Sequence, residues 1–191
     1  MRVISAAFRL WLRLWRALVS SALLLFYRIA FYPNFTVGKD VILQKGVRIS
    51  ATDGGKISIG SGTTISADSM LIAKRGQLSI GEHGFIGRHC VVVAATEITI
   101  GANALIAERV SIRDQQHGFS EDVSTPYRLR ESTYAQIIIG DNVWIGAACF
   151  IAKGVTIESG VVIGANSMVN SSLQSRSLYA GNPARLIREL G

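Results

Sequence analysis

An aliphatic residue recurs at every sixth position of this chain from Ile139 to Val169, through Ile145, Ile151, Ile157 and Ile163. A small or polar residue, often glycine, follows each one. Four places further on stands another small or apolar residue, at Val143, Cys149, Val155, Val161 and Ser167. A period of six fits neither an α-helix nor a single strand. It is typical of a β-helix built from hexapeptide repeats. We therefore expect an all-β solenoid with aliphatic side chains stacked along its axis.

The repeat extends upstream and is interrupted once by a long segment. Copies of one strand-like segment begin at residues 57, 78, 98 and 137, so the first three lie 21 and 20 residues apart. Three hexads make 18, so each coil has one corner lengthened by two or three residues. These corners are polar: 52–56, 74–77 and 95–97. The fourth copy follows only after 39 residues, which leaves 114–136 as a long polar loop. Long loops in compact domains are usually functional or disordered.

Composition supports one solenoid domain, at 33–191, with an appended segment at 1–32. Of the 191 residues, 49% are hydrophobic, enough for a continuous apolar column with paired coils. The open ends of the stack need caps, and we expect a helix at each end, the second a short one at 184–190. Cys90 and Cys149 occupy inward positions several coils apart, too distant for a disulfide.

The first 32 residues separate basic from aromatic side chains on a helical wheel. One sector holds Arg2, Ser5, Arg9, Arg13, Arg16 and Ser20. The opposite side holds Ile4, Phe8, Trp11, Trp15, Leu18 and Val19. The uncharged run at 17–27 is too short to cross a bilayer, which takes about 20 residues, and no signal-peptide cleavage site follows it. We expect an amphipathic helix on an anionic membrane surface. Packing on the solenoid or on neighbouring subunits is the alternative.

The net charge of +7 comes largely from this segment. No nucleic-acid-binding motif accompanies it, so nucleic acid is not an expected partner.

Four motifs in the C-terminal half carry a resemblance: Ile-Gly-Asp-Asn-Val-Trp-Ile-Gly at 139–146, Gly-Val-Thr-Ile at 154–157, Val-Ile-Gly-Ala at 162–165 and Ala-Gly-Asn-Pro-Ala-Arg at 180–185. In these motifs the chain resembles the hexapeptide-repeat acyltransferases, closest to those that O-acetylate sugars and bacterial polysaccharides. The resemblance covers about residues 37–191. It implies a left-handed parallel β-helix, a homotrimer, and acetyl-CoA as co-substrate in a groove between subunits, with no metal.

Acetyl transfer to a hydroxyl requires a base, and histidine suits that role near neutral pH. His117 lies outside the repeat, where the coils give way to the long loop. The resemblance implies an Asp-x-x-His-x-Phe segment there with the histidine as catalytic base. Asp114 is the candidate to orient its imidazole or to contact the sugar, and a turn-capping role is the alternative. His83 and His89 fall at corner positions; His83 is expected to be a solvated corner residue, and the role of His89 is left open.

The resemblance also implies a set of acetyl-CoA-binding residues. Trp144 is expected at the acyl-CoA tunnel, since a large outward ring needs a partner, and simple packing against a neighbouring subunit is the alternative. The backbone of Gly146, Ala147 and Ala165 is expected along the pantetheine arm. Arg185 and Arg188 are expected near the nucleotide phosphates, and a solvated basic tail is the alternative for both.

We therefore expect a CoA-dependent O-acetyltransferase that acts on a sugar or glycan, free or lipid-linked, in exopolysaccharide, capsule or lipopolysaccharide synthesis. Its expected location is the inner face of the cytoplasmic membrane, as a peripheral protein. Alternatives are an acetyltransferase of a soluble small molecule such as serine or an antibiotic, a γ-carbonic-anhydrase-like enzyme, and a non-catalytic β-helix. The second of these requires a three-histidine zinc site, and the loop after His117 holds no further histidine.

Overall fold

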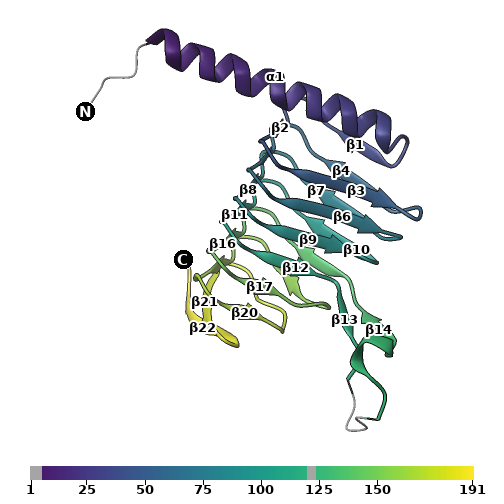
Figure 1. Ribbon diagram of the computed structural model, residues 1–191. Coiled ribbons are helices and arrows are strands. Elements are labelled where there is room, and N and C mark those ends of the chain that lie inside the picture. The colour runs from purple at the N-terminus through teal and green to yellow at the C-terminus, as the bar shows by residue number, and fades with distance from the viewer. Residues whose placement is uncertain (1–5, 120–123) are drawn as a thin grey trace.

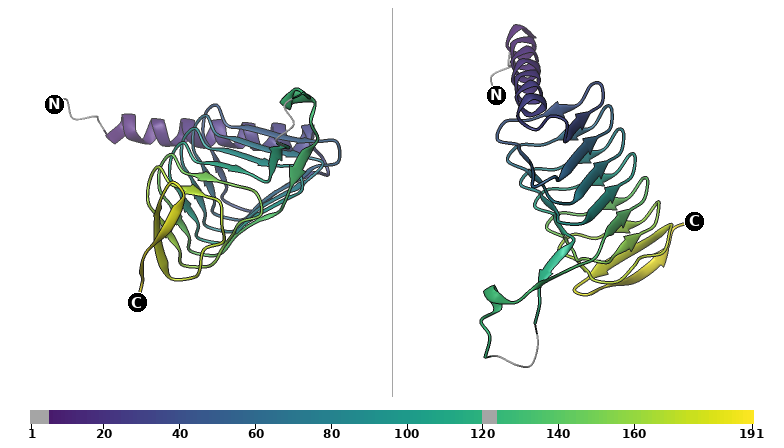
Figure 2. Two further views of the ribbon diagram at one scale, coloured as in Figure 1. Left: turned by 90° about the horizontal axis from the view of Figure 1, so that it is seen from below. Right: turned by 90° about the vertical axis from the view of Figure 1, so that its right-hand side faces the viewer.

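The computed structural model describes residues 6–119 and 124–191. It is a parallel β-solenoid of six coils beneath a long N-terminal helix, α1 (Ala6–Ala30) (Figure 1). This architecture confirms the expected solenoid and is consistent with the left-handed β-helix that the resemblance implies. Viewed close to the stacking direction, the coils superpose as a triangle (Figure 2).

Each side of the triangle is one sheet, parallel throughout except that the last two strands of sheet B pair antiparallel. Sheet A contains β1 (Phe35–Val37), β4 (Lys56–Ile59), β7 (Gln77–Ile80), β10 (Glu97–Ile100), β15 (Ile137–Ile139) and β18 (Thr156–Ile157). Sheet B contains β2 (Ile42–Leu43), β5 (Thr64–Ile65), β8 (Phe85–Ile86), β11 (Leu105–Ile106), β16 (Trp144–Ile145), β19 (Val162–Ile163), β21 (Ser177–Gly181) and β22 (Ala184–Glu189). Sheet C contains β3 (Arg48–Thr52), β6 (Met70–Lys74), β9 (Val91–Ala94), β12 (Ser111–Arg113), β17 (Phe150–Ile151) and β20 (Met168–Val169).

The hexad residues form the core, as the period predicts. Every aliphatic residue of the series from Ile139 to Val169 is at most 1% exposed. The fifth positions also point inward, and Cys149 and Ser167 are buried there. Gly146 shows why small residues follow the aliphatic ones, because a Cβ there would lie 2.6 Å from the backbone nitrogen of Ala165 in the next coil. Close stacking of the corners therefore excludes a side chain at that position.

The three corners of the triangle differ in character. The A–B and B–C corners are tight turns, and residues in the left-handed conformation stack there, such as His83 (φ 55°), Asn103 (φ 56°) and Asn142 (φ 53°) at A–B. Asn and Gly adopt this conformation at little cost. The lengthened corners expected from the 20- and 21-residue spacings all lie between sheets C and A. The predicted corner positions of His83 and His89 are confirmed.

The long excursion leaves the stack at this same C–A corner, after β12. Its base is an antiparallel hairpin, β13 (Gln115–His117) and β14 (Ser132–Tyr134), and a short 3₁₀ turn (η1, Tyr127–Leu129) lies further out. The hairpin points away from α1, toward the C-terminal end of the solenoid (Figure 1). The long interruption therefore projects a two-stranded arm from one edge of the molecule.

Helix α1 lies across the N-terminal end of the solenoid and overhangs it (Figures 1 and 2). Ser20 and Tyr27 are buried against the first coil: the Leu43 amide donates to the Ser20 hydroxyl (2.9 Å), and the Tyr27 hydroxyl donates to the Val47 carbonyl (2.9 Å). The expected helix is thus present and closes the first coil. Arg2 and Ile4 lie outside the described residues, as do the side chains of Arg9, Arg13 and Arg16.

The C-terminal segment corrects one expectation. Residues 184–190 were expected to form a helix, but Ala184–Glu189 is a strand, β22, that pairs antiparallel with β21. Leu186, Ile187 and Leu190 have helical spacing, yet the turn after Gly181 folds the chain back onto β21. Pairing with that strand gives the backbone hydrogen bonds that an isolated short helix forms only marginally. The last coil is therefore capped by a hairpin.

Candidate functional site

A pocket of about 610 Å³ lies on the outer face of sheet B, under the C-terminal hairpin. We call it the Trp144 pocket. Its lining consists of Ala107, Trp144, Gly146, Ala147, Val162, Ile163, Gly164, Ala165, Leu178, Arg188 and Leu190. Apolar and backbone atoms dominate the wall, and Arg188 provides a cation at its rim. The pocket suits a largely apolar ligand that carries a negative charge near Arg188.

Five of the six residues expected to bind acetyl-CoA gather in this pocket: Trp144, Gly146, Ala147, Ala165 and Arg188. They come from neighbouring coils and the C-terminal hairpin. Arg185 does not line the pocket, and its guanidinium donates to the Ala184 carbonyl instead (3.0 Å). Leu178 and Leu190, which the sequence did not single out, complete the wall.

Trp144 owes its position to strand register. In β16 it points outward while Ile145 points into the core, and it pairs with Leu105 in β11 and with Val162 in β19. The ring is 51% exposed. A tryptophan at an outward position this open usually has a partner, either a ligand or a neighbouring subunit. The residue therefore offers one flat apolar wall to the pocket.

Trp144 belongs to a longer outward row on sheet B, which we call the B-face row. Its members occupy the same register position in successive coils: Ile42, Thr64, Phe85, Leu105, Trp144, Val162 and Leu178. Ile42, Phe85, Leu105 and Trp144 are 41–51% exposed. The matching outward positions of sheet A are mostly Ser and Thr, such as Ser58, Ser79 and Thr99. Sheet A therefore lacks the apolar outward row of sheet B, whereas sheet C carries Met70, Val91, Phe150 and Met168 at one outward position.

His117 lies at a different edge. It is the last residue of β13, is exposed, and pairs with Ser132 across the hairpin. Its imidazole makes no side-chain hydrogen bond to any residue in the described part of the chain. The hairpin and the C-terminal strands occupy opposite sides of the triangle when it is viewed close to the stacking direction (Figure 2). Within one chain the candidate base and the Trp144 pocket are therefore apart.

Asp114 is fully buried, and its carboxylate forms hydrogen bonds with the preceding coil. It accepts hydrogen bonds from the Ala95 amide (2.8 Å), the Thr96 amide (2.7 Å) and the Thr96 hydroxyl (2.9 Å). Its own carbonyl accepts from the Ala135 amide (3.0 Å), which closes the base of the excursion. This is the turn-capping role that the sequence left open. A direct role in orienting His117 stays a prediction.

A second, polar pocket that the sequence did not single out lies at the C–A corner. It has a volume of about 390 Å³ and is lined by Gly54, Lys56, Arg75, Gly76, Gln77, Thr96 and Glu97. We call it the edge pocket. It spans three successive lengthened corners, and Thr96 connects it to Asp114 at the start of the hairpin. The repeated polar corners were the signal that could have located it.

Cys90 and Cys149 are free and buried, as expected. Burial raises the pKa of the Cys90 thiol to about 11, and it also raises the pKa of Cys149. Each thiol donates to a backbone carbonyl, Cys90 to Ala107 (3.0 Å) and Cys149 to Gly164 (3.1 Å). They are neutral packing residues, not nucleophiles. Among residues 6–119 and 124–191, no three His, Cys, Asp or Glu side chains gather as metal ligands would.

Comparison with known proteins identifies the family. Residues 136–171 match the family model described as bacterial transferase hexapeptide (six repeats). The chain is 31% identical over 142 residues to the putative lipopolysaccharide biosynthesis O-acetyl transferase WbbJ of Escherichia coli, covering 71% of this chain and 72% of that protein. It is 29% identical to a probable acetyltransferase of Mycobacterium tuberculosis over 82% of this chain, but spans only 52% of that longer protein.

A solved structure with the same fold is AntD, an N-acyltransferase from Bacillus cereus, in complex with dTDP and 3-hydroxybutyryl-CoA. The TM-score is 0.70 at 29% identity, over 83% of this chain and 85% of that one. The repeat, the fold and these relatives agree with one another. The chain belongs to the hexapeptide-repeat acyltransferase family.

Proposed function

We propose that the protein transfers an acetyl group from acetyl-CoA to a sugar hydroxyl. The observation that carries the proposal is the Trp144 pocket, where five residues expected from the family resemblance line one apolar slot with Arg188 at its rim. The pantetheine arm is long and weakly polar, and the nucleotide end carries phosphates. The apolar wall of the Trp144 pocket matches the pantetheine arm, and Arg188 matches the phosphates, since a guanidinium binds phosphate oxygens well.

His117 supplies the base. As the acceptor hydroxyl attacks the thioester carbonyl, its proton passes to the imidazole, the new C–O bond forms and the C–S bond breaks. The imidazolium then returns the proton to the departing thiolate. An exposed imidazole with no hydrogen-bond partner among the described residues is free to meet an acceptor at this point.

The separation of His117 from the Trp144 pocket requires a second subunit. The B-face row is an apolar surface that runs the length of one side, and burying it against a neighbouring copy would be favourable. Contacts in a cyclic homotrimer are head-to-tail, so the row would pack against a different surface of the next copy. If that surface is the C–A edge, it brings the β13–β14 hairpin of the next copy toward the Trp144 pocket. Each active site would then be shared by two chains.

Peripheral membrane association is the proposed role of α1. No helix within the described residues is long and apolar enough to cross a bilayer, and the outward side of α1 is apolar along its length. Aromatic residues there stack in series, with ring centroids 5.8 Å apart for Phe8 and Trp11 and 6.1 Å apart for Trp11 and Trp15. Indole rings favour the membrane interface. The inner face of the cytoplasmic membrane is the proposed location.

The acceptor class rests on relatives and on the edge pocket. WbbJ is named as an O-acetyl transferase of lipopolysaccharide synthesis, which favours a glycan hydroxyl. AntD is an N-acyltransferase solved with dTDP, which makes the amine of a nucleotide-linked amino sugar the second candidate. Lys56, Arg75, Gln77 and Glu97 in the edge pocket offer donors and acceptors suited to either.

The test is direct measurement of CoA release and of the acetylated product, with soluble glycans and a nucleotide-linked amino sugar offered as separate acceptors. We expect acetyl-CoA-dependent transfer to glycan hydroxyls that Ala165→Phe abolishes, because the phenyl group would fill the Trp144 pocket. Ala152→Phe is the control, since residue 152 lies outside that pocket. Transfer to the amine alone would replace the first acceptor class with the second, and no transfer to either would refute the proposal.

A further inference from the structure

Helix α1 presents opposite faces to the solenoid and to the outside. Ser20, Leu23, Leu24 and Tyr27 lie toward the first coil. With 100° between successive residues, the opposite side carries Trp11, Trp15, Leu18, Ala22, Leu25 and Ile29. Of these, Leu18, Leu25 and Ile29 are more than 60% exposed. The apolar stripe therefore points away from the coils, along the stacking direction.

This geometry fixes the orientation of the solenoid relative to any surface that the stripe enters. Because α1 lies across the end of the stack (Figures 1 and 2), a membrane that receives the stripe must lie roughly perpendicular to the solenoid axis. Interfacial helices lie in the membrane plane with the apolar face about 5–10 Å deep. The coils then extend from the membrane as a column.

The height of the candidate site follows from counting coils. In sheet B, β16 lies four strands below β2, and in sheet C, β12 lies three strands below β3. At about 4.8 Å per strand these steps amount to about 14–19 Å. The helix axis adds about 10 Å, the usual spacing between packed layers. Trp144 and the base of the hairpin therefore stand about 25–30 Å from the membrane surface, and His117, in a hairpin that points away from α1, lies at least as far (Figure 1).

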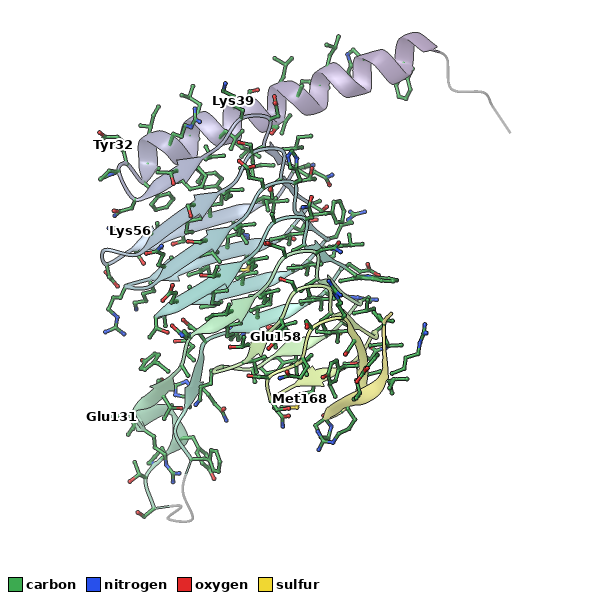
Figure 3. The ribbon with its side chains drawn as sticks, turned by 180° about the vertical axis from the view of Figure 1, so that it is seen from behind. Tyr32, Lys39, Lys56, Glu131, Glu158 and Met168 are labelled. Carbon is green, nitrogen blue, oxygen red and sulfur yellow. The ribbon has the colours of Figure 1, made fainter. Side chains whose placement is uncertain are left out.

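A polar edge runs from the membrane end of the solenoid to the level of the β13–β14 hairpin. The lengthened corners descend along the C–A edge from the first coil to the β13–β14 hairpin, and the edge pocket lies among them. Lys56 at its upper end and Glu131 in the hairpin lie along the same side of the molecule, whereas Lys39 lies on another corner (Figure 3). Thr96 touches both the pocket and Asp114. An extended glycan descending from the membrane would meet polar groups at each level.

We propose that the acceptor is a membrane-anchored oligosaccharide, acetylated on a sugar several residues from its lipid, with the solenoid as the spacer that selects that sugar. This inference rests on the proposed transferase function and names its substrate class. A sugar joined directly to the lipid phosphate would stay at the membrane surface, out of reach of His117. A free glycan would carry no such restriction.

The test uses glycans of increasing length, each prepared on a lipid anchor in anionic vesicles and also without the anchor. Anchored glycans shorter than the spacer should give less than about one tenth of the rate of long ones, while the soluble forms should differ little. A variant with residues 60–80 duplicated gains one coil, about 4.8 Å, and should need a longer anchored glycan. Similar rates on short and long anchored glycans would overturn the proposal that the solenoid acts as a spacer.

Variants separate this inference from the proposed function. The double variant Leu18→Glu, Leu25→Glu should no longer require a minimum length of the anchored glycan on vesicles, because both side chains lie on the outward stripe. Its rate on soluble glycans should stay the same. Lys56→Ala should raise KM severalfold for long glycans, whereas Lys39→Ala on another edge should leave that KM unchanged. Equal KM values for Lys56→Ala and wild type would remove the edge from the acceptor path. If the wild-type protein transfers acetyl to none of the soluble acceptors, the transferase function itself is refuted.

Discussion

Substitution of Asp114 distinguishes anchoring from catalysis. Its carboxylate accepts from three donors, the Ala95 amide, the Thr96 amide and the Thr96 hydroxyl, at 2.7–2.9 Å. Hydrogen bonds to a charged group contribute about 1.5–3 kcal/mol each. Asp114→Asn keeps one acceptor oxygen and turns an NH₂ group toward backbone donors, so one or two of the three bonds are lost. We expect a loss of about 2–4 kcal/mol in the free energy of unfolding.

The assay is urea denaturation followed by circular dichroism, with kcat measured at a temperature where the variant is folded. Thr96→Val removes only the hydroxyl donor and should cost about 1.5–3 kcal/mol. If Asp114 acts by anchoring the hairpin, kcat of the folded Asp114→Asn enzyme should stay within about threefold of wild type, whereas a lost imidazole-orienting group costs orders of magnitude. Wild-type stability in Asp114→Asn would refute the anchoring argument.

Three further predictions concern the site and the core. His117→Ala should lower kcat by about 10²–10⁴, the range for a lost general base, while His83→Asn, at a corner where Asn is tolerated, should be silent; wild-type turnover in His117→Ala would exclude it as the base. Arg188→Ala should raise KM for acetyl-CoA about fivefold, equivalent to about 1 kcal/mol, and Arg185→Ala should raise it less, which a KM comparison checks. Cys90, whose pKa of about 11 favours the thiol, should alkylate at least about 100-fold more slowly at pH 8 than in unfolded protein; labelling at the unfolded rate would contradict its burial.

The repeat made most of the fold predictable. A strict period of six determines which residues face inward, and Ile145 and Cys149 are buried as the pattern requires. The spacing also located the lengthened corners and the excursion that carries His117. These features are local, since each depends on one hexad and its neighbours in the next coil.

Features set by distant contacts were not predictable. Ser20 shares a sector of the wheel with arginines, yet it is buried because the Leu43 amide needs an acceptor. Residues 184–190 have helical spacing but pair with β21, which is a tertiary preference. His117 is apart from the Trp144 pocket because the hairpin leaves the C–A corner and the pocket lies on the outer face of sheet B. The hexad pattern alone does not say which face or corner each segment occupies.

The shared active site is the central claim, and subunit complementation tests it most directly. His117→Ala and Ala165→Phe would be coexpressed with different tags, and mixed trimers isolated on both. If each site takes His117 from one subunit and the Trp144 pocket from the next, every mixed cyclic trimer contains one intact site, or about one third of the wild-type number. We expect about that activity from two variants that are each inactive alone. Activity that stays at the level of the separate variants would contradict a site shared between subunits.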